Sequence, residues 1–261
     1  MNEPSPIQQL LDIMRHLRDP QRGCPWDRAQ DYRSLAPYTL EEACEVIDTL
    51  ERGDLGALRD ELGDLLFQVV FLSQLAEEEG RFDFQAVAAA IGDKLLRRHP
   101  HVFGDASQRT GDNEGWEAIK AGERRSRGQH GVLADVPRSL PALSRAAKLG
   151  RRAGGVGFDW PDAAGARDKV LEEIRELDVA AGQGDREAMA EELGDLLLAV
   201  TSWSRQLKLD PETSLRRANA KFEARFAAME ALAATRGLAL EGLSAADWDG
   251  LWNEVKAGIQ S

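Results

Sequence analysis

The chain has 261 residues, which is enough for one large domain or two domains of ordinary size. Apolar residues make up 43% and the formal net charge is −12, so the composition indicates a globular chain and excludes a uniformly basic nucleic-acid-binding surface. The two cysteines, Cys24 and Cys44, form no CxxC motif, which argues against a disulfide framework and favours a cytoplasmic protein.

The sequence also argues against targeting to a membrane. The first ten residues, MNEPSPIQQL, lack a basic segment followed by an apolar one, so we expect no signal peptide. The most apolar stretch, 62–76, is interrupted by Asp64, Gln68, Ser73 and Gln74 and is too short and too polar to span a bilayer. We therefore expect neither a membrane nor a nucleic acid as a partner.

Helical periodicity runs along almost the whole chain. In the first segment, apolar residues follow the i, i+3, i+4, i+7 pattern at Ile7, Leu10, Leu11, Met14 and Leu17. Similar patterns predict helices near 39–52, 55–79, 83–98, 113–125, 138–152, 163–181, 185–207, 212–235 and 244–257. The segments 19–27, 99–115 and 127–137 are expected to be loops. Because no segment alternates apolar and polar residues as a strand would, we predict an all-α fold.

Short motifs return after about 131 positions, always in the same order. ELGDLL occupies both 61–66 and 192–197, and LEEACEV at 40–46 answers LEEIREL at 171–177. WD at 26–27 answers FD at 158–159, and WEAIK at 116–120 answers WNEVK at 252–256. These matches predict two tandem helical modules, each built around a metal site like that of a four-helix bundle. We expect an N-terminal repeat at 1–125, a linker at 126–136 and a C-terminal repeat at 137–261.

Each repeat carries the pattern Glu-Glu-x-x-Glu followed by Glu-x-x-Asp. In the second repeat these residues are Glu172, Glu173, Glu176, Glu192 and Asp195. In the first repeat they are Glu41, Glu42, Glu45, Glu61 and Asp64. Residues three apart lie on one side of a helix, and a tight turn at 182–185 can set the two acidic edges of the second repeat face to face.

The acidic pair of the second helix stands among apolar residues, namely Leu193, Leu196, Leu197, Leu198 and Val200. A helix that is apolar nearly all round is expected to be buried, and buried carboxylates are costly unless a cation compensates them. Carboxylates without matching Cys or His suit Mg²⁺ or Mn²⁺ better than Zn²⁺. A single EExxE string is usually a solvated helix face, but the duplication favours a metal site. Its expected ligands are Glu173, Glu176, Glu192 and Asp195, with Glu42, Glu45, Glu61 and Asp64 as the candidate counterpart.

EExxE followed by ExxD on two helices resembles the signature of the all-α nucleoside triphosphate pyrophosphohydrolases. The duplicated layout, with GCPWD, PYTLEE, GDLLFQVVF, RRHPHVF, PRSLPAL, VGFDW and KFEARF, is similar to the MazG family over essentially the whole chain. The resemblance implies Mg²⁺-dependent hydrolysis of NTPs, and also of dNTPs, to NMP and pyrophosphate. It implies a helical bundle that works as a homodimer or a higher homo-oligomer. It also implies that catalysis belongs mainly to the C-terminal repeat, with the N-terminal repeat weakly active or regulatory.

A triphosphate held by a metal also needs cations from the protein. In the second repeat the candidate substrate-binding residues are Lys169, Lys221, Arg225 and Lys256 for the phosphates and Trp252 for stacking on the base. Each cation alone is more typical of an ordinary surface residue, and Trp252 is equally typical of a core aromatic. The first repeat has Tyr38 in place of Lys169 and offers Lys94, Arg98 and Lys120.

The mechanism that these residues favour is metal-assisted attack of water on the triphosphate. Glu172 is the spare carboxylate of the second repeat, a candidate base or a residue just outside the metal ligands. The residues expected to be catalytic are therefore Glu172, Glu173, Glu176, Glu192 and Asp195. The alternative is a non-catalytic helical scaffold that binds nucleotide or acts as a regulatory partner, and metal binding without turnover would favour it.

Overall fold

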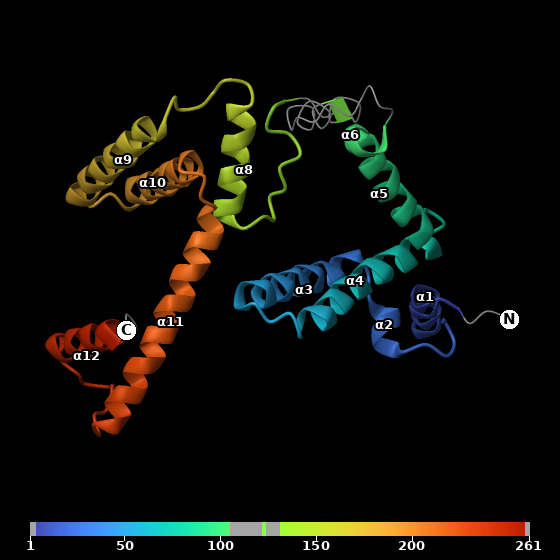
Figure 1. Ribbon diagram of the computed structural model, residues 1–261, viewed down its shortest axis with the longest axis horizontal. Coiled ribbons are helices and arrows are strands. Elements are labelled where there is room, and N and C mark those ends of the chain that lie inside the picture. Colours follow the sequence, from blue (N-terminus) through green and yellow to red (C-terminus); the bar gives the residue numbers. More distant parts are fainter. Residues whose placement is uncertain (1–3, 105–121, 124–130, 259–261) are drawn as a thin grey trace. The chain divides into compact units, whose positions relative to one another are not determined.

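The computed structural model describes the chain except for residues 1–3, 105–121, 124–130 and 259–261 (Figure 1). The described residues form helices and no strand, which confirms the predicted all-α class. Contacts divide the chain into two compact units, Met1–Lys120 and Ala121–Ser261. No helix in the described part is both long and apolar enough to cross a membrane. Residues 113–121 and 124–125 of the predicted helix at 113–125, and residues 126–130 of the predicted linker at 126–136, lie outside the described residues.

The first unit is organised around a pair of long helices. Its elements are α1 (Pro6–Leu17), α2 (Pro25–Ala29), α3 (Tyr32–Arg52), α4 (Leu58–Glu78), α5 (Phe84–Arg98) and α6 (Pro100–Phe103). The helices α3 and α4 pair along much of their length, and α1 packs on α4 (Figure 1). Side chains from α1, α3 and α4 form one apolar core, made by Leu11, Met14, Leu35, Val70, Phe71 and Leu75.

The helix α3 begins seven residues earlier than the periodicity predicted, at Tyr32 instead of residue 39. Asp31 caps it, because its side chain accepts hydrogen bonds from the backbone N–H groups of Arg33 and Ser34. The Ser34 side chain in turn accepts a hydrogen bond from the backbone N–H of Asp31, which completes a reciprocal cap. Pro37 lies inside the resulting helix. Because proline is unfavourable within helices, the residues before residue 39 were not predicted to be helical.

Two short helices lie in segments that were expected to be loops. The helix α2 falls within and just after the predicted loop at 19–27, and α6 falls within the predicted loop at 99–115. Both have a proline at the first helical position, where a missing backbone N–H costs nothing. Each is only about one turn long, too short to show a periodic apolar pattern.

The second unit contains a second pair of long helices, α9 and α10, and a further pair formed by α11 and α12. Its elements are α8 (Ala142–Gly154), α9 (Ala163–Gln183), α10 (Arg186–Gln206), α11 (Pro211–Thr235) and α12 (Ala245–Gly258). The helices α9 and α10 lie side by side, and α8 packs on α10 (Figure 1). The long helix α11 packs against α12 through Met229, Ala233, Leu251 and Val255.

The turn between α9 and α10 is fixed by the residues at its ends. Gly184 ends α9 in the left-handed conformation, with a φ of 72° that side-chain-bearing residues rarely adopt. Asp185 then caps α10 by accepting hydrogen bonds from the backbone N–H groups of Glu187 and Ala188. The reversal sets the acidic edges of α9 and α10 facing each other, as the spacing predicted.

The expectation that α10 is buried nearly all round is wrong for the single chain. Leu193, Leu197, Leu198 and Val200 are all exposed, and only Ala199 and Thr201 of this helix are fully buried. A hairpin of two helices covers only the sides on which the helices face each other or a third element. The remaining apolar side of α10 is therefore exposed in the single chain.

Candidate metal centre

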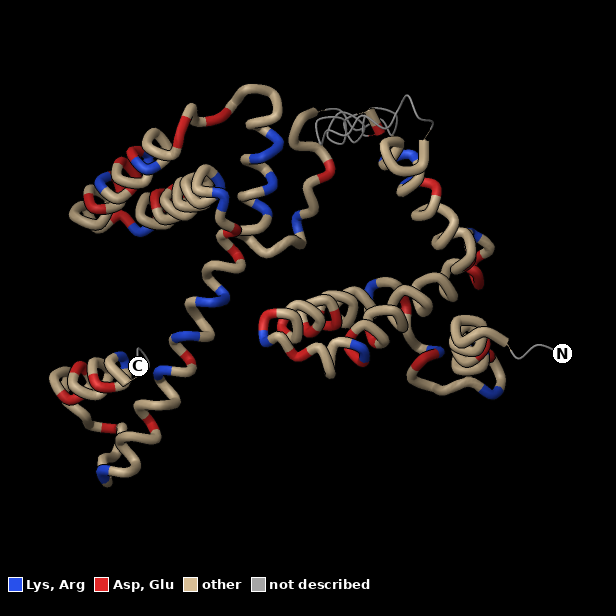
Figure 2. The backbone as a smooth tube through the Cα atoms, viewed as in Figure 1, with Lys and Arg blue, Asp and Glu red and all other residues tan. Residues whose placement is uncertain are grey.

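Three carboxylates of the second unit converge between α9 and α10. One carboxylate oxygen from each of Glu173, Glu176 and Glu192 lies within 4.8 Å of the other two. Glu173 is only 4% exposed, whereas Glu192 is half-buried and Glu176 is exposed. Acidic residues gather along this hairpin (Figure 2). The i, i+3 spacing on α9 and the tight turn after it together produce the cluster.

Lys169 lies one turn before this cluster and forms ion pairs with it. Its Nζ atom is 2.7 Å from Oε1 of Glu172 and 2.7 Å from Oε1 of Glu173. Its pKa is raised well above the ordinary value, first by the hydrogen bond to Glu172 and then by that to Glu173. The sequence predicted Lys169 as a phosphate ligand, and in the structure its partners are the carboxylates of Glu172 and Glu173.

The remaining negative charge of the cluster affects Glu176. The pKa of Glu176 is raised above its ordinary value, first by the partial loss of water around its carboxylate beside the other acids, although the residue as a whole is exposed, and then by the charge of Glu173. Lys169 opposes this rise but does not cancel it. Hard oxygen donors that crowd together with an excess of negative charge fit a divalent cation such as Mg²⁺ or Mn²⁺.

The first unit repeats the arrangement between α3 and α4. Carboxylate oxygens of Glu42, Glu45 and Glu61 lie within 4.8 Å of one another. The pKa of Glu42 is raised above its ordinary value, first by burial and then by a side-chain hydrogen bond with Glu45. The position that answers Lys169 is Tyr38, whose ring lies edge-on to Trp26 with centroids 5.8 Å apart. The two clusters therefore share their carboxylates but differ in the group one turn before them.

The aspartates of both motifs lie outside these three-carboxylate groups. Asp195 and Asp64 are exposed, and neither belongs to the convergent set. Asp64 is still near enough to contribute to the raised pKa of Glu42 through its charge. Glu172 is exposed and bonds Lys169, so it stands beside the cluster and not in it.

The other candidate substrate-binding residues of the second unit lie on α11 and α12. The Arg225 guanidinium lies over the Trp252 ring, 5.5 Å from its centroid, and Lys221 and Lys256 are exposed. In the described part of the chain, no hydrogen bond or ion pair joins these four residues to the acidic cluster. Trp252 lies in an aromatic cluster with Phe222, Phe226 and Trp248, which fits the alternative of a core aromatic, but the sequence analysis did not predict this cluster. The aromatic pair in KFEARF was the signal that could have revealed it.

The candidates of the first unit are less completely described. Lys94 and Arg98 lie on α5, and both are half-buried. Lys120, together with Trp116, falls outside the residues that the structure describes. The proposed cation set of this repeat therefore remains a prediction.

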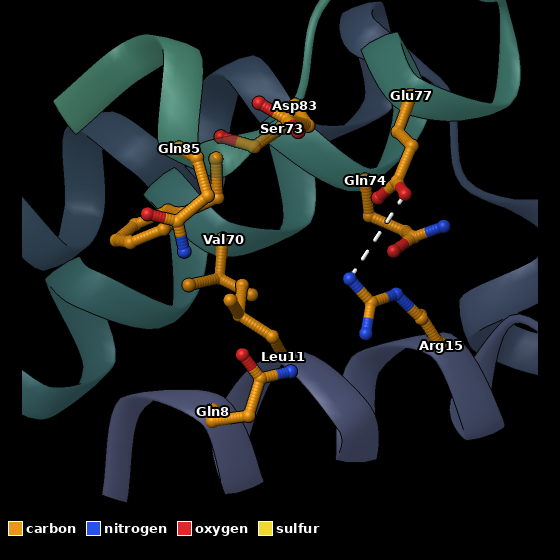
Figure 3. A pocket seen from close by; sticks show the side chains of 10 residues that line it. Gln8, Leu11, Arg15, Val70, Ser73, Gln74, Glu77, Asp83 and Gln85 are labelled. Carbon is orange, nitrogen blue, oxygen red and sulfur yellow. Dashed lines mark ion pairs between the residues drawn. The ribbon is translucent and has the colours of Figure 1, made fainter. Parts of the chain in front are cut away.

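The first unit has a small cavity between α1, α4 and the start of α5, and none of the clustered carboxylates lines it. Its volume is about 80 Å³, and residues such as Gln8, Ser73 and Gln85 line it (Figure 3). Arg15 and Glu77 form an ion pair at its side, with 3.9 Å between Nη2 and Oε1. Sites for drug-sized ligands enclose roughly 300–1,000 Å³. This cavity is therefore too small to hold a nucleotide.

Comparisons with known proteins converge on one family. The family model described as "MazG nucleotide pyrophosphohydrolase domain" matches residues 30–103 and 165–228, which contain the two acidic clusters. The chain is 50% identical over 254 residues to a nucleoside triphosphate pyrophosphohydrolase of Escherichia coli, covering 96% of this chain and 97% of that protein. It is 41% identical over 255 residues to a nucleoside triphosphate pyrophosphohydrolase/pyrophosphatase MazG of Thermotoga maritima, covering 98% and 97%. A nucleoside triphosphate pyrophosphohydrolase of Mycolicibacterium smegmatis is 32% identical over 223 residues, covering 77% and 69%.

Proposed function

The chain belongs to the MazG nucleotide pyrophosphohydrolase family, and on that premise we propose that it hydrolyses NTPs, and also dNTPs, to NMP and pyrophosphate. The single observation that carries this assignment is the convergence of Glu173, Glu176 and Glu192 inside a segment that matches the family. Such a centre is suited to holding a divalent cation against a polyphosphate.

We propose Mg²⁺ as the cation, with Mn²⁺ as a substitute. Glu173, Glu176 and Glu192 would hold it, and Asp195 would join them after a change of side-chain conformation. When bound, the cation neutralises charge on phosphate oxygens and lowers the pKa of the attacking water. Glu172 stands next to the cluster, where it can orient that water or accept its proton.

The cations of the second unit bind the phosphates in this proposal. Lys169 is already at the cluster, and Lys221, Arg225 and Lys256 supply further positive charge from α11 and α12. Trp252 offers a ring for the base to stack on. Because no hydrogen bond or ion pair joins the latter four residues to the cluster among the residues that the structure describes, we propose that a homodimer or a higher homo-oligomer completes the site. The exposed leucines of α10 support such an assembly.

We propose that the C-terminal repeat is the principal catalytic site and that the N-terminal repeat is weakly active or regulatory. The first cluster keeps its three carboxylates but has Tyr38 where the second has Lys169. A repeat that binds a cation and nucleotide without turnover would fit the scaffold alternative for that half of the chain. The free thiols Cys24 and Cys44 are compatible with the cytoplasm, which we propose as the compartment.

The test supplies the full chain with an NTP and Mg²⁺ and resolves the products by chromatography. We expect NMP and pyrophosphate, and release of NDP and orthophosphate would contradict the assignment. Glu192→Gln should abolish turnover, whereas the matched variant Glu61→Gln should retain most of it. Asp195→Asn and Asp64→Asn form a second matched pair with the same expectation. If the first-repeat variants were the inactive ones, the choice of catalytic repeat would be wrong.

A further inference from the structure

The ion pair between Lys169 and Glu173 bears on how metal and substrate bind to the second repeat. The Nζ atom of Lys169 is 2.7 Å from a carboxylate oxygen of Glu173 and 2.7 Å from one of Glu172. Glu173 is the most buried of the three convergent carboxylates and shares the cluster with Glu176 and Glu192. The lysine ammonium therefore lies against a carboxylate that the metal centre also needs.

A buried carboxylate without a cation is costly, so Lys169 stabilises the cluster while no metal is bound. Once a divalent cation enters, the ammonium and the metal repel each other at close range, and each weakens the binding of the other. A triphosphate presents several anionic oxygens, which are strong partners for a lysine. The ammonium can then leave Glu173 without losing an anionic partner.

The first repeat provides the matched comparison within the same chain. Tyr38 occupies the position of Lys169, one turn before Glu42, and packs edge-on against Trp26. Its cluster has the same carboxylate spacing, with oxygens within 4.8 Å, but no ammonium one turn before it. The effect of the ammonium on metal binding can therefore be separated from the effect of the carboxylates.

We propose that Lys169 is an exchangeable counter-ion that couples metal binding to nucleotide binding at the second repeat. It occupies Glu173 in the free chain, lowers the metal affinity there, and moves to the phosphates when the nucleotide arrives. Metal and nucleotide consequently bind with positive and reciprocal coupling. The nucleotide half of this proposal rests on the proposed function, while the competition between Lys169 and the metal does not.

The experiment measures Mn²⁺ binding to the full chain by electron paramagnetic resonance, without nucleotide. Glu45→Gln and Glu61→Gln are introduced first, so that the second-repeat site dominates the signal. In that background we expect Lys169→Met to tighten Mn²⁺ binding by about tenfold, within the usual range of coupling between sites. A non-hydrolysable NTP analogue should tighten Mn²⁺ binding in the background chain and do so much less in the Lys169→Met chain.

The reciprocal variant is the control. With Glu176→Gln and Glu192→Gln silencing the second site, Tyr38→Lys should weaken Mn²⁺ binding at the first site by a similar factor. Circular dichroism checks that each variant is folded, and Lys169→Gln replaces Lys169→Met if the latter is not. Unchanged or weaker Mn²⁺ binding after loss of the Lys169 charge would overturn the proposal, as would an unaffected first site in Tyr38→Lys. Failure of the chain to release pyrophosphate would instead refute the proposed function and leave the nucleotide-free comparison standing.

Discussion

Glu173 and Glu42 occupy matching positions in the two repeats, yet their neighbours balance their charge differently. Glu173 pairs with Lys169 at 2.7 Å, whereas Glu42 has Glu45 as a hydrogen-bond partner and a raised pKa. The burial of Glu42 and then its hydrogen bond to a second carboxylate favour the protonated form of Glu42. At the scale of single residues, the clearest difference between the clusters is therefore that the first repeat has Tyr38 at the position where the second repeat has Lys169.

The importance of Glu173 can be tested against a neighbouring glutamate. Glu173→Gln removes the most buried carboxylate of the cluster, and we expect kcat/KM for NTP hydrolysis to fall by about a hundredfold or more. Glu191→Gln removes an exposed glutamate on α10 that lies next to Glu192 but outside the cluster. It should leave kcat/KM nearly unchanged, and equal losses in the two variants would argue against the proposed ligand set.

The raised pKa of Glu176 predicts a dependence of stability on pH. Below the ordinary value of 4.5, folded and unfolded chains both hold the proton and Glu176 contributes nothing. As the pH rises through 4.5 towards the raised pKa, the unfolded chain loses the proton first, so the contribution becomes destabilising and remains so at higher pH. Glu176→Gln should therefore raise the Tm in EDTA at about pH 7 and not at about pH 4. Calorimetric scans would contradict this if the rise were the same at both pH values.

At the scale of helices, capping side chains determine where the elements that carry the site begin and end. Asp162 caps α9 by accepting hydrogen bonds from the N–H groups of Ala164 and Gly165, and Asp185 does the same for α10. Gly184 reverses the chain between them in the left-handed conformation. Since Glu176 and Glu192 lie about two turns from this reversal, its geometry sets how the acidic edges meet.

The helices that carry the site were largely predictable, because apolar periodicity and caps are local properties of the sequence. The predicted ends of α9 at 163–181 and of α10 at 185–207 differ from the structure by at most two residues. The start of α3 was missed because Pro37 interrupts its pattern, although Asp31 and Ser34 formed a readable cap. The convergence of Glu173, Glu176 and Glu192 was also predictable, since it needs only i, i+3 spacing and a tight turn.

The turn itself can be tested with two glycines of the same hairpin. An added Cβ would meet nothing within 4 Å at either Gly184 or Gly182. A difference between the two alanine variants would therefore not come from clashes with neighbouring atoms. Gly184 has a φ of 72°, and Gly184→Ala should destabilise the chain by about 1–2 kcal/mol. Gly182 lies within α9, where Gly182→Ala should stabilise it by about 0.5–1 kcal/mol. Urea unfolding measures the free energy of unfolding of both variants. Changes of the same sign in the two variants would contradict the role given to Gly184.

At the scale of the whole molecule, the apolar side of α10 and the placement of Lys221 and Lys256 on other helices than the acidic cluster both support the proposed homo-oligomer. Leu193, Leu197 and Leu198 are 46–50% exposed in the single chain. In the described part of the chain, neither Lys221 on α11 nor Lys256 on α12 forms a hydrogen bond or an ion pair with the cluster. The sequence could suggest these residue types but not their positions, because contacts between distant elements or between chains leave no local pattern.

The proposed assembly predicts a molecular mass and its loss on substitution. One chain has a mass of 28.7 kDa, so a homodimer should have twice that mass in light scattering after size-exclusion chromatography. Leu197→Glu places a charge on the apolar side of α10, where burial against a partner would be strongly unfavourable, and should shift the mass towards one chain. Leu238→Glu changes a leucine that is also exposed, at 42%, but lies beyond the end of α11, and should leave the mass unchanged. A wild-type mass of one chain, or equal effects of the two substitutions, would show that α10 does not form the interface.

If Leu197→Glu also abolishes turnover while its helical content is retained, the active site requires the assembly, because Leu197 itself lies outside the acidic cluster.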